Sequence, residues 1–422
     1  MAQERLTRED ARILGLETGN VRGHTCKVLL LDGRVELDDL RSRILARLDR
    51  APRLRQRLLA PRGFGRPVWV DDATFDIAAQ VRSLEIGRPL PPTGLAEVVA
   101  RLMCERLDRA RPLWRVDLVG GLESGGSAVV WKVHHCMADG HAMMGLGAAV
   151  LWDRAPEPEP AQAAEDAARR AGEAARVVRA RRRWKPDGVL RRELAPGAGE
   201  TQFDRRAGPA RRVGFAAADL EVLRRAGKAV SQAVTVNDVV LAVVTGAVRR
   251  WLIGRGAPVT RGIRVKVPVS LHGSERAATA IGNRDSYFFV DLPVAEPDPA
   301  RRLLAINAET SERKRHRDAE LIYRLPSKGL LARWAMSPHV FTFNVSNVPG
   351  PREPLYVAGA RVRELFTVAE IAQHHALRVA VVSASGRLGF GLCADRDAVP
   401  DFELLVEGLE SSLRELAGGT GG

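Results

Sequence analysis

The sequence predicts a mixed α/β protein made of two halves, each with its own helices and strands. Segments with apolar residues at helical spacing alternate along the chain with short β-branched runs. A polar stretch that begins after Trp152 separates the halves. The 422 residues, at roughly 150 per domain, are enough for two or three domains with sizeable cores.

The composition is that of a soluble globular protein, with 45% hydrophobic and 27% charged residues. Residues 1–13 contain no signal-peptide h-region, and no apolar run approaches the ~20 residues of a membrane span, so we expect a cytoplasmic protein. The four cysteines form no CxxC pair, which speaks against a zinc site or a disulfide framework and favours reduced thiols.

The formal net charge of +14 favours anionic partners such as nucleic acid, lipid headgroups or phosphate-bearing cosubstrates. Nucleic acid ranks last among them, because an aromatic content of 5% offers few stacking platforms and no nucleic-acid motif is present. No GxGxxG follows a strand and no GxxxxGK[ST] occurs, which removes support for the nucleotide-dependent classes.

The first half predicts strands and helices in the following order. The run Thr25–Asp32 is typical of a strand, and apolar residues at helical spacing follow from Leu37 until Pro52. A second helical stripe covers Leu95–Leu107, and Trp114, Val116 and Leu118 alternate as in a half-buried strand. The β-branched run Ala128–Val133 then leads into the sequence HHCMADG.

The composition changes to PEPEP and an Ala/Arg/Glu stretch, so we expect a linker over residues 153–210 between domains at 1–152 and 211–422. Residues 164–192 can form a basic, weakly amphipathic helix. Such a segment is either a solvated connector or a membrane-surface contact.

The second half begins with a strand and a helix in RRVGFAAADLEVLRRAGKAV. The strongest helix pattern follows Thr235, which has capping-box spacing with Asp238, and its continuous apolar stripe predicts a buried element. Strands are then expected in GIRVKVPVSL, DSYFFVDLPV, HVFTFNVSNVPGP and LRVAVVSASGRLGFGLCAD, before a terminal helix around Phe402–Leu416.

The densest polar cluster is HHCMADG, directly after an apolar strand. Neutral imidazole of His135 can take a proton from a hydroxyl and return it to a leaving group, a contribution of about 10²- to 10⁴-fold. Asp139 is suited to fix the loop by binding a cation or a backbone donor, and Gly140 lets a substrate chain pass close.

Three alternatives remain for this cluster. His134 and His135 can be histidines satisfied within a core or turn. Metal ligation by His135, Asp139 and His141 lacks a dedicated ligand spacing such as HExxH. Cys136 can be a nucleophile, although a single cysteine beside a buried strand is more often a small hydrophobic residue.

HHCMADG, together with PLW upstream and ND downstream, resembles the bacterial wax ester synthase/diacylglycerol acyltransferase family. LTREDARILGLE, PVSL with GN at residues 282–283, NVPGP and the closing GFGLCAD…PD match that family as well, in the family's order. HHxxxDG alone also occurs in other coenzyme-A-dependent acyltransferases and in condensation domains. The resemblance implies two chloramphenicol-acetyltransferase-like domains that enclose a tunnel.

The resemblance also implies roles for individual residues. His135 resembles the catalytic base, with His134 beside it, Asp139 as a mainly structural carboxylate and Gly140 keeping the passage open. Asn237 and Asp238 resemble the second active-site motif. Asn237 can direct its amide at the reacting carbonyl, or both residues can simply cap the following helix.

Pro112, Leu113 and Trp114 are expected to shape domain packing or the acyl tunnel, since none of them can transfer a proton. Two positions depart from the family pattern. Leu6–Asp10 replaces an S-P-L-D-like opening, and Gly23 stands where a methionine is expected before His24, at the entrance to the acyl pocket.

The function implied is a metal-free O-acyltransferase without a bound cofactor, which moves a fatty acyl group from acyl-CoA to diacylglycerol or a long-chain alcohol. The transfer is direct, without an acyl-enzyme. Because the products are apolar, the resemblance and the basic surface together predict peripheral attachment to a membrane or lipid droplet. The rivals are an acyltransferase that tailors a polyketide, glycolipid or peptide, and a catalytically silent lipid-binding protein.

Overall fold

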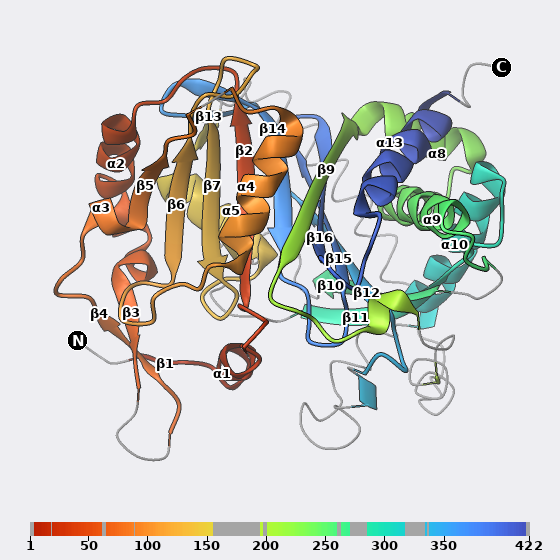
Figure 1. Ribbon diagram of the computed structural model, residues 1–422, viewed down its shortest axis with the longest axis horizontal. Helices are drawn as coiled ribbons and strands as arrows, with labels where there is room; N and C mark the ends of the chain where they lie inside the picture. The colour runs from red at the N-terminus through yellow and green to blue at the C-terminus, as the bar shows by residue number, and fades with distance from the viewer. Residues whose placement is uncertain are drawn as a thin grey trace.

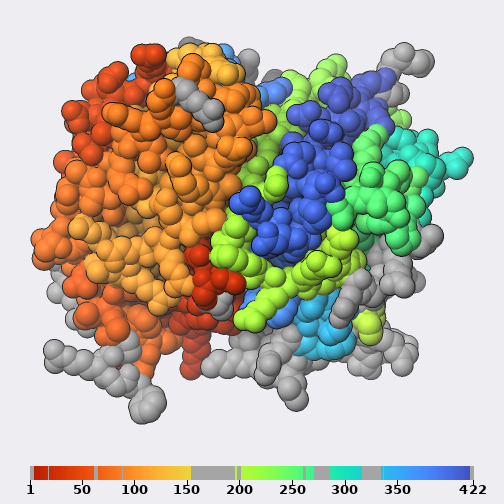
Figure 2. Space-filling model, in the orientation of Figure 1, coloured from red at the N-terminus to blue at the C-terminus, as the bar shows by residue number. Residues whose placement is uncertain are grey.

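The computed structural model describes residues 4–17, 19–60, 65–87, 89–154, 195–196, 201–259, 263–270, 285–316, 334–335 and 337–418. Two large sheets stand side by side, the first formed mainly by the first half of the chain and the other by the second (Figure 1). The space-filling view shows the two halves in contact along the middle of the molecule (Figure 2).

The first sheet has seven strands, and most of their side chains are buried. Their order across the sheet is β5 (Val81–Leu84), β6 (Trp114–Val119), β7 (Ala128–His134), β2 (His24–Leu31), β14 (Ala360–Ala369), β13 (Leu355–Val357) and β8 (Asp153–Arg154). Every residue of β7 is buried. Such complete burial accounts for the unbroken apolar run Ala128–Trp131 at the start of the strand.

The second sheet has six strands. Their order is β11 (Asp285–Leu292), β10 (Ile263–Ser270), β12 (Phe343–Pro349), β15 (Leu377–Ala384), β16 (Arg387–Asp395) and β9 (Arg211–Asp219). A small third sheet pairs β1 (Glu4–Arg5), β4 (Val68–Asp71) and β3 (Gln56–Leu59).

Helices cover the faces of both sheets. The described α-helices are α1 (Arg8–Gly15), α2 (Leu37–Leu45), α3 (Ile77–Gln80), α4 (Pro92–Cys104), α5 (Gly140–Val150), α8 (Leu220–Val230), α9 (Val236–Gly254), α10 (Pro299–His316) and α13 (Phe402–Gly418). The apolar residues of α9 pack with α13 and the outer face of the second sheet in one core. A second core lies between the first sheet, α4 and β9, and a third lies beneath α5.

Strand β14 joins the two halves. It belongs to the second half of the sequence, yet it pairs with β2 in the first sheet over Thr25–Leu31, and Figure 1 shows it in blue among red-to-yellow strands. The next strands, β15 and β16, return to the second sheet. The sequence analysis did not identify β14, and its position means that the first sheet contains strands of both halves.

Two glycines let β14 and β16 approach each other closely. A Cβ on Gly391 would lie 2.0 Å from the carbonyl oxygen of Thr367, and one on Gly389 would lie 2.2 Å from that of Leu365. No larger residue fits at either position without a shift of the backbone. The GxG pattern in RLGFGLCAD therefore reflects close packing between the two sheets.

The structure confirms the mixed α/β class and the segments expected as strands at β2, β6, β7, β10, β11, β12, β15 and β16. It also confirms the helices at α2, α4, α9 and α13, with α9 buried from Asp238 to Val248. Most of the expected linker, and the GN pair at 282–283, lie outside the described residues. Within the described part of the chain, no helix is both long and apolar enough to cross a bilayer.

Candidate active site

The HHCMADG segment forms a turn between a buried strand and a helix. β7 ends at His134, and α5 begins at Gly140. Asp139 is the N-cap of α5, where its Oδ1 accepts a hydrogen bond of 2.7 Å from the backbone N–H of Ala142. The buried carboxylate therefore fixes the direction in which the helix leaves the turn.

His134 is held by the backbone of its own turn. Its Nδ1 accepts a hydrogen bond of 3.1 Å from the backbone N–H of Cys136, which places the proton of the neutral ring on Nε2. That Nε2 lies 4.0 Å from Oε2 of Glu17. Burial, His135 and Arg109 lower the pKa of His134 to about 3, so its ring is neutral and serves the turn.

His135 points to different surroundings. Its backbone N–H donates to the carbonyl oxygen of Gly23 at 2.8 Å. Burial and the charge of Arg378 lower the pKa of its imidazole to about 4, while Asp139 and the backbone of Ala138 act in the opposite direction. The ring is therefore a neutral imidazole at physiological pH, the form that can accept a proton.

Gly23 is required by the histidine turn. Its φ of +70° is one that residues with a Cβ rarely adopt, and a Cβ there would lie 2.7 Å from Nε2 of His134. In this chain Gly23 leaves room for the ring of His134.

The second half contacts the turn through β12. A Cβ on Gly140 would lie 2.9 Å from Cγ2 of Val348, and one on Gly350 would lie 3.0 Å from Cε of Met144 in α5. The sequence predicted that a substrate chain passes close to Gly140, whereas in the structure the side chain of Val348 lies there. The NVPGP segment, which includes Val348 and Gly350, seats the second half against the start of α5.

The PLW segment supports the turn from the other side. The carbonyl oxygen of Leu113 accepts the backbone N–H of His134 at 2.9 Å. Trp114 is buried, and its indole N–H donates to the carbonyl oxygen of Leu54 at 2.8 Å. The carbonyl oxygens of Pro112 and Trp114 both accept from the Gln80 side chain. These contacts place PLW in the packing that holds β6 and β7.

Asp238 has a structural role that its position shows directly. It is fully buried and forms a capping box with Thr235 at the start of α9. Its Oδ2 also accepts from Asn307 at 2.9 Å, and its Oδ1 accepts from Thr310 at 2.6 Å. Asp238 therefore ties α9 to α10, whereas Asn237 is half-buried beside it.

Two cations near the turn were not identified from the sequence. Lys27 in β2 is fully buried and donates to Oγ1 of Thr367 at 2.8 Å; burial lowers its pKa to about 7, and Asp139 acts to raise it. Arg378 in β15 donates to the carbonyl oxygen of Glu370 at 3.1 Å. Lys27 could have been identified from the sequence, because it is a charged residue within the apolar run TCKVLLLD.

The described residues do not favour the other chemistries considered for the turn. Cys136 is buried, and burial raises the pKa of its thiol, which disfavours a thiolate. Among the described residues, no group of three or more His, Cys, Asp or Glu is arranged to hold a metal ion.

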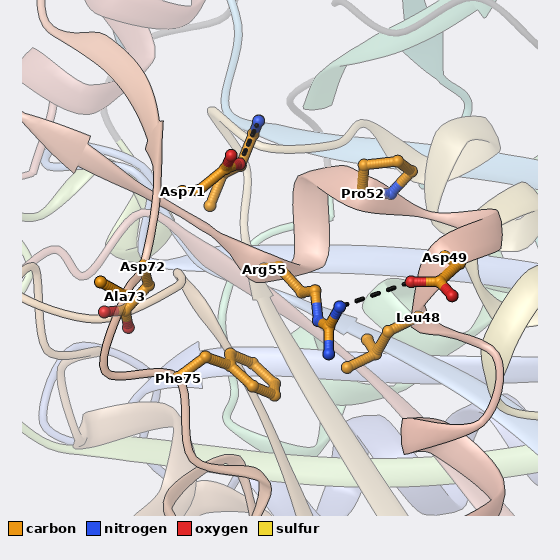
Figure 3. A pocket seen from close by; sticks show the side chains of 9 residues that line it. Leu48, Asp49, Pro52, Arg55, Asp71, Asp72, Ala73 and Phe75 are labelled. Carbon is orange, nitrogen blue, oxygen red and sulfur yellow. Dashed lines mark hydrogen bonds and ion pairs between the residues drawn. The ribbon is translucent and has the colours of Figure 1, made fainter. Parts of the chain in front are cut away.

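Two cavities lie away from the histidine turn. One, of about 580 Å³, is lined by residues that include Asp49, Arg55, Gln56, Asp71, Asp72 and Phe75 (Figure 3). Figure 3 shows Arg55 paired with Asp49 on one side of it. The other, of about 210 Å³, is lined in part by Pro112 and Trp114. Neither lining includes HHCMADG.

Comparison with known families gives two matches along the chain. Residues 6–193 match the wax ester synthase/diacylglycerol acyltransferase catalytic domain, and residues 281–417 match the WS/DGAT C-terminal domain. A Mycobacterium tuberculosis protein named "Probable diacyglycerol O-acyltransferase tgs1" is 34% identical over 413 residues, covering 89% of this chain and 87% of that protein.

Solved structures share the fold. The wax ester synthase/diacylglycerol acyltransferase from Marinobacter aquaeolei VT8 superposes with a TM-score of 0.74 at 24% identity, covering 99% of this chain and 100% of that one. The starter condensation domain of rhizomide synthetase, in complex with C8-CoA and Leu-SNAC, gives a TM-score of 0.58 at 15% identity over 99% and 94%. The chloramphenicol-acetyltransferase-like class expected from the sequence is confirmed by these neighbours.

Asp238→Ala should lower the free energy of unfolding by about 3 kcal/mol, because it removes a helix cap and leaves the side chains of Asn307 and Thr310 without their acceptor. Asn237→Ala is the matched control and should change that free energy by less than about 0.5 kcal/mol. Urea denaturation at pH 7 measures both. Equal stability of the two variants would contradict the structural role of Asp238.

Acid should destabilise the protein through His135. Its pKa in the folded protein is about 4, below the unfolded value, so the unfolded chain binds more protons between about pH 6.5 and pH 4. The stability that neutral His135 permits is complete above about pH 6.5 and falls as the pH drops toward 4. From pH 7 to pH 5, wild type should lose about 1–2 kcal/mol more than His135→Gln in urea titrations. Parallel losses in the two proteins would refute this assignment.

Proposed function

The chain belongs to the wax ester synthase/diacylglycerol acyltransferase family and is an O-acyltransferase of triacylglycerol or wax ester synthesis, and we propose that its catalytic base is His135. The observation that carries this proposal is the position of His135, a neutral, half-buried imidazole at the turn where the two halves meet. His134 instead serves the turn, where its Nδ1 accepts the backbone N–H of Cys136.

The proposed reaction is a direct transfer. His135 takes the proton of the acceptor hydroxyl while the oxygen attacks the thioester carbonyl carbon of acyl-CoA, and a tetrahedral oxyanion forms. Collapse of this intermediate makes the ester bond and breaks the carbon–sulfur bond. The departing thiolate then takes the proton from the imidazolium, which restores neutral His135. No acyl-enzyme and no metal take part.

The surroundings of His135 suit a base that must stay neutral between turnovers. Burial and Arg378 disfavour the imidazolium, while Asp139 partly offsets them. When the acceptor proton arrives, the nearby Asp139 carboxylate lowers the cost of the transient positive charge. Asp139 thus serves as a positioning residue that acts through the turn and through its charge.

Asn237 is the member of the second motif that we assign to the substrate. Both carboxylate oxygens of Asp238 already accept hydrogen bonds within the protein. The carboxamide of Asn237, half-buried at the first turn of α9, has donors suited to the developing oxyanion. The partial positive charge of the helix N-terminus adds to that stabilisation.

Acyl-CoA is the proposed donor, and diacylglycerol or a long-chain alcohol is the proposed acceptor. A condensation domain of the same fold was solved with C8-CoA, and the mycobacterial relatives are named for diacylglycerol. A passage between the two sheets would bring both substrates to His135. The chain uses acyl-CoA as a cosubstrate and needs no bound cofactor in this scheme.

Loss of the base should abolish turnover while the fold persists. His135→Ala should lower kcat about 10²- to 10⁴-fold in an assay that follows release of the CoA thiol with a panel of acyl-CoAs and lipid alcohols. His374→Ala removes an exposed histidine and should retain full rate. Retained turnover in His135→Ala would refute the role of this residue, and the acceptor panel separates lipid alcohols from carrier-bound or peptide acceptors.

We also propose that the protein attaches peripherally to a membrane or lipid droplet, where its apolar substrates and products reside. The surplus of 14 positive charges supports attraction to anionic headgroups. The purified protein should float with liposomes that contain anionic phospholipid, and 0.5 M salt should release it. Absence from the floated fraction at low salt would contradict the proposal.

A further inference from the structure

A polar row crosses the inner face of the second sheet. Asn344 in β12 is the cross-strand partner of Lys266 in β10 on one side and of Arg378 in β15 on the other. The residues before and after Asn344, Phe343 and Val345, are buried in the core beneath α9. Because side chains alternate along a strand, Asn344 lies on the opposite face, toward the first half.

This face of β12 is the one that meets the histidine turn. Val348, four residues after Asn344 and on the same face, contacts Gly140. Arg378 donates to the carbonyl oxygen of Glu370, whose own N–H donates to the carbonyl oxygen of His24 beside β7. The charge of Arg378 also lowers the pKa of His135, which agrees with this placement.

Asn344 carries a buried acceptor without a donor. Its Oδ1 is inaccessible to water and has no hydrogen-bond partner within the described part of the chain. A buried amide oxygen left in this state is costly, and such groups in native structures commonly mark a place where a ligand or water binds. On its two sides lie Lys266, whose Nζ is 4.0 Å from the centre of the Tyr287 ring, and Arg378, which donates to Glu370. The unmet acceptor fits a ligand that offers an N–H, such as a secondary amide.

The proposed substrates differ in their ability to supply that group. Diacylglycerol and a long-chain alcohol each have a single O–H, and His135 takes its proton. The pantetheine arm of acyl-CoA contains two secondary amides, the nearer one only two carbons from the thioester sulfur. Of the two proposed substrates, only the acyl donor therefore offers an N–H to Asn344 while the reaction proceeds.

We propose that Asn344 is a substrate-binding residue, whose Oδ1 accepts a hydrogen bond from an amide N–H of the pantetheine arm of acyl-CoA. The inference rests on the proposed function, because it takes acyl-CoA as the donor. It assigns the row of Lys266, Asn344 and Arg378 to recognition of the donor and leaves the acceptor lipid to other residues.

Two thioesters that differ in one group test the contact. S-decanoyl-N-acetylcysteamine carries the amide N–H, and the decanoyl thioester of 2-mercaptoethyl acetate has an ester oxygen in its place. Wild type should use the amide about tenfold better in kcat/KM, whereas Asn344→Leu should use both within about twofold. Because each preference is a ratio within one protein sample, incomplete folding of a variant does not alter it.

Full-length acyl-CoA gives a second measurement. Asn344→Leu should raise KM for decanoyl-CoA about tenfold and leave KM for the acceptor unchanged, while Asn344→Asp, which keeps an acceptor oxygen, should retain the amide preference. Gln373→Leu, which removes an exposed carboxamide, is the matched control. A wild type that transfers from acyl-CoA without amide preference, or a leucine variant that keeps the preference, would overturn the inference. A wild type inactive with every acyl-CoA would instead contradict the proposed function.

Discussion

The arrangement depends on β14 being shared between the halves. This strand pairs with β2 in the first sheet, while Gly389 and Gly391 of β16 bring the second sheet against its backbone. β15 follows β14 in the chain and pairs with β16, and β12 pairs with β15. With β14 and β16 packed together, the inner faces of β15 and β12 are therefore turned toward the histidine turn. The position of His135 relative to the second half is therefore set by backbone packing. In that packing Gly389 and Gly391 of β16 approach carbonyl oxygens of β14.

Burial keeps both histidines neutral, but the two neutral rings have different roles. At His134 it secures a neutral ring that accepts the Cys136 amide and closes the turn. At His135 it maintains the unprotonated form that chemistry requires, assisted by a cation from the second sheet. Asp139 contributes to both roles. Its Oδ1 accepts a hydrogen bond from the backbone of α5, and its negative charge lies near His135. One desolvated segment, HHCMADG, thus contains both the histidine that holds the turn and the proposed catalytic base.

The sequence predicted local features well and long-range ones poorly. Periodicity located β7 and α9, and the spacing of Thr235 and Asp238 identified the capping box, because these signals depend on neighbours a few residues away. β14 was missed because its partner β2 lies more than 300 residues earlier. Arg378, Asn344 and Val348 were missed for the same reason: only the pairing of β12 and β15 places them opposite HHCMADG.

The expected linker, 153–210, is anchored at its first residue and again near its C-terminal end, at Thr201. Asp153 forms ion pairs with Arg43 and Arg47 and lies in β8, which pairs with β13, and Thr201 closes a capping box with Asp204. The two halves are also held together without a covalent bond, because β14 of the second half pairs with β2 of the first. A protease that nicks the chain between Asp153 and Thr201 should therefore yield two fragments that stay associated and comigrate under native conditions. The association of the two halves therefore does not rest on their covalent connection alone.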